Sequence, residues 1–199
     1  MKKPAITQTT IHDILANRWS PRAYDASKPV SQTQLISMLE AARWAPSCFG
    51  DQPWRFVVCD KATNPQAWQS AYDTLVPGNQ TWAHHAPVLI LVCASHLFSH
   101  NQKPNRWAPY DTGAAAENLC LQATALGLAA HQMGGFDVAK AQAAFSIPEP
   151  YSLMAMIAVG YAAAADILPD DLREREVAPR QRRALGELFF NGSWDKAIL

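Results

Sequence analysis

The sequence predicts an α+β fold, with a sheet of three or four strands packed between helices. Short apolar runs rich in β-branched residues are interspersed with longer segments whose apolar residues recur every three or four positions. Hydrophobic residues make up 49% of the 199 residues and charged residues only 17%, which is typical of a chain that buries a core. At this length we expect a single domain over residues 1–199.

Two helices are expected before the first strand. Thr9 or Thr10 can cap a short helix, which the Ser20–Pro21 step ends. Ser31 caps a second helix with one apolar face. This helix must stop before Pro46, because the residue that precedes a proline disfavours helical backbone. A loop then leads to the first strand.

The middle of the chain holds the clearest strand signals. Arg55–Cys59 and Val88–Cys93 are short apolar runs that predict buried strands. Asn64–Pro65 opens a helix between them, and Pro77–Gly78–Asn79 predicts a break in the chain. Thr112–Leu128, rich in Ala and Leu, predicts a long central helix.

The last third contains one more helix and one more strand. After the loop at Gly134–Gly135, Asp137 caps a helix, and Met154–Val159 predicts a third strand. From Pro169 the chain is polar and rich in arginine until an apolar patch at Leu188–Phe190. Helices therefore outnumber strands, which favours a layered α+β architecture over a β-sandwich or a helical bundle.

The charge balance excludes several classes of function. The 17 Lys and Arg residues equal the 17 Asp and Glu residues, so there is no basic surplus for nucleic acid or an anionic membrane. The longest apolar stretches, Ala86–Ala94 and Leu153–Ala165, fall short of the roughly 20 residues that span a bilayer. Met1–Thr10 lacks the apolar core of a secretory signal. We expect a soluble, cytoplasmic protein.

No metal site is expected. His84 and His85 form the one close histidine pair, and sequence neighbours point in different directions from a helix or a strand. The cysteines are widely spaced and are predicted to be reduced structural thiols; they are Cys48, Cys59, Cys93 and Cys120.

Four polar segments are candidates for a site, and each has an ordinary structural alternative. Arg18-Trp19-Ser20-Pro21-Arg22 has the guanidinium groups and hydroxyl that bind a phosphate, but it also fits an arginine-rich surface turn. The loop Ala45–Trp54, fixed by prolines, suits a binding loop or a plain helix-to-strand connection. Gly134–Gly135 allows close approach of a planar ligand, or simply a turn. The cluster Arg180, Arg182 and Arg183 also fits a solvated tail.

In order and spacing, these segments resemble the flavin-dependent nitroreductase family, from about Ile11 to Phe190. The family's opening signature corresponds to Arg18-Trp19-Ser20-Pro21-Arg22-Ala23-Tyr24. Its second signature corresponds to Ala45-Pro46-Ser47 followed by Gln52-Pro53-Trp54. The resemblance implies a nitroreductase-like fold with a mainly antiparallel central sheet. It also implies an intertwined homodimer with FMN at two sites across the subunit interface.

The resemblance also implies a role for each candidate cofactor-binding residue. The FMN phosphate would be held by Arg18, Ser20, Arg180 and Arg182, with Trp19 in the same motif. The pyrimidine edge of the flavin would face Arg22 and Asn79. The other subunit would contribute Pro46, Ser47 and Cys48, and the backbone N–H groups of Gly134 and Gly135 would lie near flavin N5.

The implied activity is that of an FMN-dependent NAD(P)H oxidoreductase. NADH or NADPH would pass a hydride to flavin N5, and a nitroaromatic or quinone would then be reduced in a ping-pong cycle. No catalytic side chain is required. Two departures from the family pattern, Gly50 and Gly134, leave the shape of the loop and the choice of donor open. Trp107, Tyr110 and Phe136 would either shape the acceptor pocket or pack in the core or interface.

Two other functions stay open at this point. The same fold can host a specialised flavoenzyme, such as a dehalogenase or a flavin-fragmenting enzyme. The chain can also be a dimeric flavin-binding protein without turnover, which would bind FMN but fail to oxidise NADH or NADPH in the presence of an acceptor.

Overall fold

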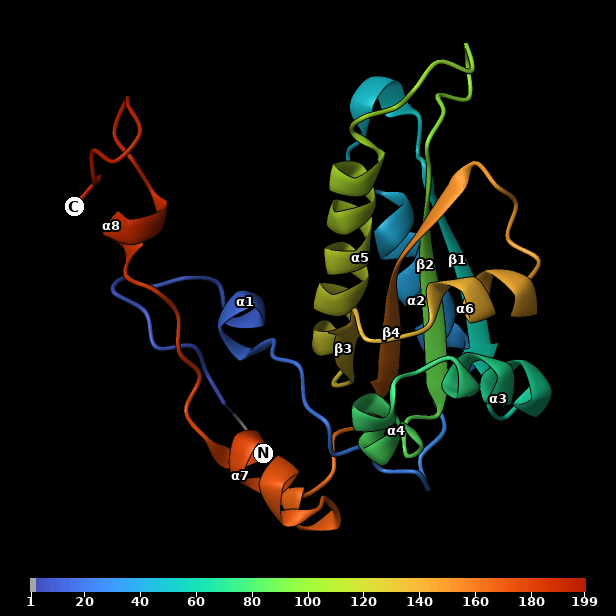
Figure 1. Ribbon diagram of the computed structural model, residues 1–199. Coiled ribbons are helices and arrows are strands. Elements are labelled where there is room, and N and C mark those ends of the chain that lie inside the picture. Colours follow the sequence, from blue (N-terminus) through green and yellow to red (C-terminus); the bar gives the residue numbers. More distant parts are fainter. Residues whose placement is uncertain (1–2) are drawn as a thin grey trace.

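A computed structural model describes residues 3–199, and a four-stranded antiparallel sheet lies at its centre (Figure 1). The strands follow the order β1-β2-β4-β3, with bounds β1 Trp54–Asp60, β2 Val88–Ser95, β3 Ala129–Met133 and β4 Tyr151–Gly160. Each neighbouring pair is antiparallel. The predicted α+β fold with a mainly antiparallel sheet is therefore confirmed.

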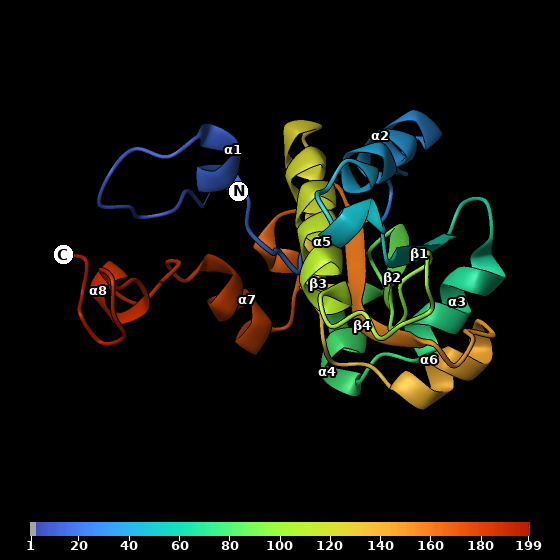
Figure 2. The same ribbon diagram turned by 90° about the horizontal axis from the view of Figure 1, so that it is seen from above.

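Helices cover both faces of this sheet (Figure 2). One face carries α2 (Gln32–Arg43) and α5 (Ala108–Ala125); the other carries α3 (Pro65–Asp73), α4 (Pro77–Ala83) and α6 (Val138–Ala144). The central strand β2 explains this arrangement, because side chains of a strand alternate between faces. Val88, Ile90 and Val92 pack toward α2 and α5, whereas Leu89, Leu91 and Cys93 pack toward α3 and α6.

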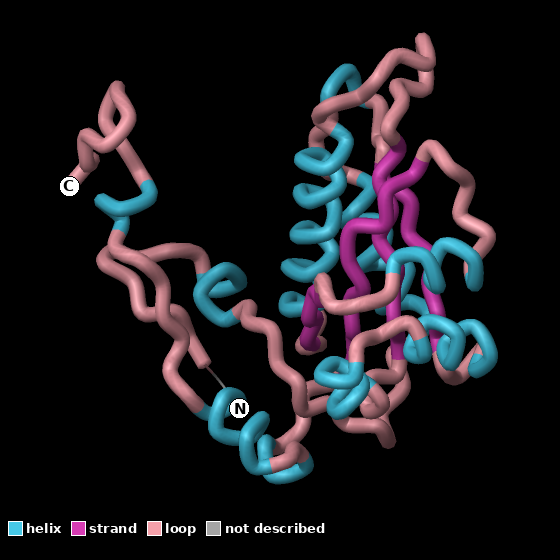
Figure 3. Tube along the Cα trace, viewed as in Figure 1, coloured by secondary structure: helices cyan, strands magenta, loops and turns pink. Residues whose placement is uncertain are grey.

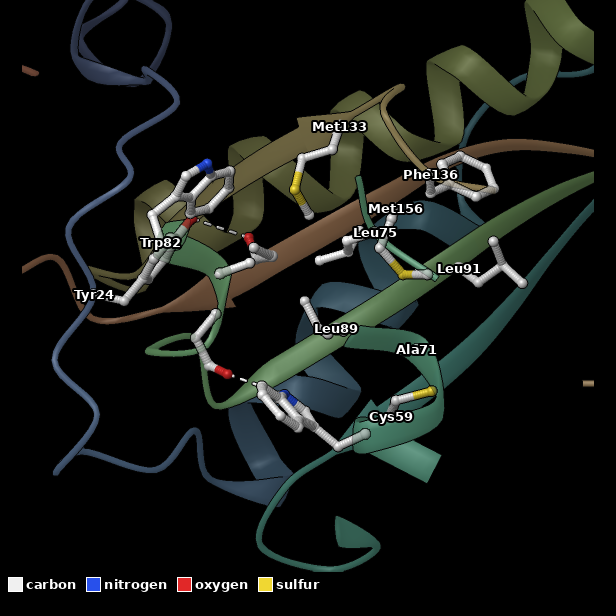
Figure 4. Packing of buried hydrophobic residues seen from close by; sticks show 14 of the residues in the cluster. Tyr24, Cys59, Ala71, Leu75, Trp82, Leu89, Leu91, Met133, Phe136 and Met156 are labelled. Carbon is white, nitrogen blue, oxygen red and sulfur yellow. Dashed lines mark hydrogen bonds between the residues drawn. The ribbon is translucent and has the colours of Figure 1, made fainter. Parts of the chain in front are cut away.

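The core beneath α3, α4 and α6 is aromatic as well as aliphatic (Figure 4). Tyr24 and Trp82 stack with ring centroids 6.1 Å apart, and the Tyr24 hydroxyl donates to the carbonyl of Ala158 at 3.1 Å. The indole N–H of Trp68 donates to the carbonyl of Ala86 at 3.0 Å. These buried polar atoms are thus satisfied, as a packed core requires.

Two sequence predictions near helix starts are wrong. The first helix, α1 (Asp13–Asn17), is capped by His12 rather than Thr9 or Thr10, because the ring Nδ1 of His12 accepts the N–H of Ile14 at 3.2 Å. Pro77–Gly78–Asn79 does not break the chain but begins α4. Pro77 occupies the first helical position, where a missing N–H removes no helix hydrogen bond.

The long helix α5 is shifted toward the N-terminus relative to the prediction. Helix α5 begins at Ala108, four residues before the predicted Thr112. It ends at Ala125, and Gly127 follows with a left-handed φ of 73°. Helix α2 is capped by Ser31, as predicted, and Gln34 completes a capping box with it. Strand β3 had no sequence prediction, because it is a short edge strand that carries polar His131 and Gln132.

The sequence did not predict the 3-10 helix η2 (Ala165–Ile167) or the two helices of the polar tail, α7 (Asp170–Val177) and α8 (Leu185–Leu188). Asp170 and Asp171 lie in the first turn of α7, where their negative charges interact favourably with the positive end of the helix dipole and stabilise the helix. Residues 3–22 and 169–199, hereafter the arms, run side by side away from the sheet (Figures 1 and 3). Within residues 3–199, no helix is long and apolar enough to cross a membrane.

Candidate functional site

A pocket of about 260 Å³ lies where the two arms meet. Its wall contains six cationic side chains: Lys3, Arg18, Arg22, Arg175, Arg180 and Arg182. Trp19, Ser20, Ala178 and Pro179 complete it. The fold thus brings the motif at residues 18–22 together with the late arginine cluster, although some 160 residues separate them. We call this the cationic pocket.

The cations in this pocket crowd one another. Burial lowers the pKa of Arg180, and the charges of Arg18 and Arg182 lower it further. Burial also lowers the pKa of Lys3; Glu176 counteracts this shift, whereas Arg180 and Arg22 add to it. An anion bound between these cations would reduce their mutual repulsion.

Contacts with the backbone and with neighbouring side chains hold several of these cationic side chains in place. Arg180 Nη1 donates to the carbonyls of Lys3 at 2.9 Å and Ala16 at 2.8 Å, which ties the two arms together. Arg18 Nη1 lies 3.4 Å from Ser20 Oγ, and its Nε pairs with Glu117 on α5 at 3.3 Å. The ammonium of Lys3 lies over the Trp19 ring, 4.6 Å from its centroid. The pocket is therefore partly preorganised.

The structure also pairs Asn79 with the glycine turn. The amide Nδ2 of Asn79, on α4, donates to the carbonyl of Gly135 at 2.9 Å, and the N–H of Val76 donates to the same oxygen at 3.1 Å. A Cβ at Gly135 would lie 2.8 Å from Asn79 Nδ2 and 2.9 Å from Val76 Cγ2, whereas one at Gly134 would meet nothing within 4 Å. Gly135 is thus required for this close approach.

Strand β3 connects the glycine turn to the cationic pocket. The imidazole Nδ1 of His131, in β3, lies 2.9 Å from the carbonyl oxygen of Pro21, next to the pocket residues. Gly134 follows the end of the strand, three residues from His131. At about 3.3 Å per residue, His131 and Gly134 are roughly 10 Å apart along this edge strand.

The predicted flavin-contacting loop lies elsewhere in the chain. Pro46–Cys48 follows α2, and the backbone N–H of Cys48 donates to Asp111 Oδ2 on the first turn of α5 at 2.9 Å. Figure 1 places this loop near the N-terminal end of α5, away from α1 and α7. The N–H of Gln52 donates to Ser47 Oγ at 3.0 Å, which closes the loop. One chain therefore does not bring Pro46–Cys48 to its own cationic pocket.

The three candidate aromatic residues differ in their surroundings. Phe136 packs in the core against α3 and α6, so its core interpretation holds. Trp107 and Tyr110 are exposed near the start of α5. They lie close in sequence to Phe98 and His100, whose rings contact Phe49 of the loop after Cys48.

Sequence reasoning missed three residues at the pocket. Lys3 and Arg175 lie outside the four candidate segments, and Arg175 and Glu176 belong to the polar tail, for which no element was predicted. Glu176 is buried on α7 and accepts hydrogen bonds from the motif at residues 18–23. The helical spacing of Leu172 and Glu176, both buried, was the available signal.

Comparison with known proteins decides the family. The Nitroreductase family model matches residues 15–161. The chain belongs to the nitroreductase family. This family chain is 34% identical to a 15.4 kDa protein of Mycolicibacterium smegmatis, described as uncharacterized, over 72% of this chain and 99% of the relative.

Two further similarities carry a description of a cofactor or an activity. A solved structure described as an oxidoreductase containing FMN has a TM-score of 0.89 and 36% identity, with 95% of each chain covered. The major NAD(P)H-flavin oxidoreductase of Aliivibrio fischeri is 37% identical over 75 residues, which cover 38% of this chain and 34% of that protein.

Proposed function

We propose that this nitroreductase-family chain binds FMN and acts as an NAD(P)H oxidoreductase. The observation that carries the proposal is the cationic pocket, in which two remote segments supply six cationic side chains and a serine hydroxyl. A phosphate monoester needs fixed positive charge together with directional donors. The donor set at this pocket therefore fits the phosphate of FMN. Arg18, Ser20, Arg180 and Arg182 are the residues we assign to it, with Trp19 beside them.

The remainder of the flavin would lie along β3, toward the glycine turn. Arg22 and Asn79 are assigned to the pyrimidine edge, and the backbone of Gly134 and Gly135 to the region of the flavin ring. Asn79 is already fixed by its hydrogen bond to Gly135, so little side-chain entropy would be lost on binding. Gly134 carries no side chain that could block the face of a planar ring.

FMN supplies hydride-transfer chemistry when it is bound, and the protein supplies orientation and electrostatics. Positive charge from Arg22 would stabilise negative charge on the reduced flavin, a preorganised electrostatic effect. The donor we assign is NADH or NADPH, and the acceptors are nitroaromatics or quinones. The name of the Aliivibrio relative and the FMN of the similar structure support this choice.

We also propose that the working form is a homodimer. The arms expose large apolar side chains, among them Ile6 at 83%, Trp194 at 82% and Leu199 at 81%. A monomer rarely leaves so many apolar residues in water on one extended feature. A second copy that receives the arms would bury them. It would also bring its own Pro46–Cys48 loop to the cationic pocket, and the separation of these two features within one chain favours that arrangement.

The test is flavin identification followed by a donor and acceptor screen. The purified protein should be yellow and release FMN on denaturation. Its flavin absorbance should bleach with NADH or NADPH and recover with menadione or a nitrofuran. A protein that binds FMN but shows no turnover with either donor would indicate a flavin-binding protein without activity. Failure to take up FMN at all would refute the proposal.

A further inference from the structure

A buried carboxylate lies behind the cationic pocket. Glu176 of α7 is 2% exposed, and its Oε1 accepts the backbone N–H groups of Arg22 at 2.8 Å and Ala23 at 3.1 Å. Its other oxygen, Oε2, has no hydrogen-bond partner among the described residues, and Arg22 Nη1 lies 3.9 Å from it. Burying a carboxylate costs free energy unless hydrogen bonds or a nearby opposite charge replace its lost hydration. Here the two backbone N–H groups supply the hydrogen bonds.

A second buried contact holds the same turn from the opposite side. The ring nitrogen Nδ1 of His131, in β3, lies 2.9 Å from the carbonyl oxygen of Pro21, and the ring packs at a tilt of 32° against Trp82, with centroids 4.6 Å apart. A neutral imidazole makes this contact only with its proton on Nδ1. Consecutive peptide groups, from the Pro21 carbonyl to the Ala23 N–H, are thus fixed between the sheet and α7.

We propose that Glu176 and His131 are positioning residues that clamp the turn Pro21–Ala23 and thereby set the geometry of the phosphate-binding pocket. Arg18 and Ser20 precede this turn and Arg22 lies within it, whereas Arg180 and Arg182 follow α7. Glu176 links these two groups directly. The inference rests on the proposed binding of FMN, and it assigns residues that touch neither the flavin nor the substrate.

Lys3 strengthens the clamp. Its ammonium donates to the backbone carbonyl of Glu176 at 2.7 Å, so the N-terminal arm is tied to the same residue of α7. Two points of the N-terminal arm, Lys3 and the turn at Arg22–Ala23, therefore meet the C-terminal arm at Glu176. A leucine of similar volume would fill the space in the core, but it would leave the N–H groups of Arg22 and Ala23 without an acceptor.

A merely structural role predicts a different outcome from a positioning role. Loss of general stability would weaken every flavin equally. Misplacement of the pocket would weaken FMN more than riboflavin, because riboflavin lacks the phosphate and would lose only its contact with Arg22. The ratio of the two dissociation constants therefore isolates the geometry of the phosphate pocket.

The experiment measures FMN and riboflavin binding to flavin-free protein by fluorescence quenching. The variants that break the clamp are Glu176→Leu and His131→Phe. Each is expected to weaken FMN about tenfold, the effect of one misplaced charged contact, and to weaken riboflavin clearly less, because only the contact with Arg22 is shared by both flavins. The conservative variants Glu176→Gln and His131→Asn keep an acceptor and a donor, respectively, and should retain most of the preference for FMN.

The matched control is Glu174→Gln, on the exposed face of the same helix, which should bind both flavins as the wild type does. If both clamp variants fold and keep the wild-type ratio, or lose both flavins equally, the clamp is refuted while the proposed function stands. Absence of FMN binding by the wild-type chain would instead refute the proposed function, and the clamp with it. Should Glu176→Leu fail to fold, His131→Phe and the two conservative variants still decide the question.

Discussion

Apolar side chains are buried to different extents in two regions of the molecule: the sheet with its covering helices, and the arms. In the sheet, β2 is buried along almost its whole length, and α2, α3, α5 and α6 cover both faces within one chain. The arms hold the cationic pocket, yet they leave the side chains of Leu188, Phe189 and Trp194 substantially exposed. The sheet region is thus a complete core, whereas the arms form a charged site on an incomplete apolar surface. Because the cationic pocket lies on the arms, we expect ligand binding to depend on the second copy of the chain that we propose covers them.

The largest effect is expected where that apolar surface is destroyed. The double variant Leu188→Asp and Phe189→Asp places two charges on the exposed apolar surface of the C-terminal arm. We expect a monomer by light scattering and loss of nearly all bound FMN, because burying an unpaired charge in an interface is strongly unfavourable. A double variant that remains dimeric and fully loaded with FMN would show that these side chains lie outside the interface.

Removing one pocket charge comes next. Arg18→Ala and Arg180→Ala should each weaken FMN by about 10- to 150-fold, since a charge-assisted hydrogen bond contributes about 1.5 to 3 kcal/mol. Isothermal titration of flavin-free protein measures this change. Arg173→Ala is the control, because Arg173 pairs with Asp170 on α7 and does not line the pocket. Unchanged FMN affinity in both pocket variants would show that the FMN phosphate does not bind at the cationic pocket.

Adding a methyl group at each of the two glycines after β3 tests the packing of the turn that we assign to the flavin ring. Gly135→Ala should destabilise the chain by about 1 to 3 kcal/mol, because the new Cβ would overlap Asn79 and Val76. Gly134→Ala should lie within about 0.5 kcal/mol of the wild type in urea unfolding, because its Cβ enters open space. Equal stability of the two variants would contradict the close approach of α4 to this turn.

The smallest effect concerns pH at the point where the arms meet the sheet. Burial lowers the pKa of His131 to about 4, although its hydrogen bond to the Pro21 carbonyl opposes the shift. The unfolded chain takes up a proton near pH 6.5 and the folded chain only near pH 4, so this group makes stability fall as pH falls through that window. Unfolding free energies at pH 7 and pH 5 should differ by up to about 2 kcal/mol more in the wild type than in His131→Asn. An identical difference in both proteins would exclude His131 as the cause.

The sequence was informative where local chemistry determines structure. Strands such as Val88–Cys93 and caps such as Ser31 and Asp137 follow from apolar runs and side-chain acceptors that neighbouring residues can use. It was uninformative where tertiary contacts decide. Strand β3 is a polar edge strand held by β4, and α7 is a highly charged helix whose buried Glu176 has its partners some 150 residues away.

The candidate site shows the same limit. The family resemblance implied Arg18, Ser20, Arg180 and Arg182 at the FMN phosphate and Arg22 at the pyrimidine edge, and the structure places all five around one pocket. Spacing gave no indication of Lys3 or Arg175, because their contribution depends on the paired course of the two arms. Nor did it show that Pro46–Cys48 lies apart from that pocket in the same chain.

Mixed dimers test the central claim, a flavin site shared between two copies, most directly. One chain carries Arg18→Ala in the cationic pocket and the other Cys48→Trp in the flavin-contacting loop, each with a different affinity tag. Each homodimer should bind little FMN, since both of its sites are damaged. The mixed dimer should recover one FMN per two chains, because one site then contains an intact pocket from one chain and an intact loop from the other. Mixed dimers that bind no more FMN than the parent homodimers would contradict a shared site.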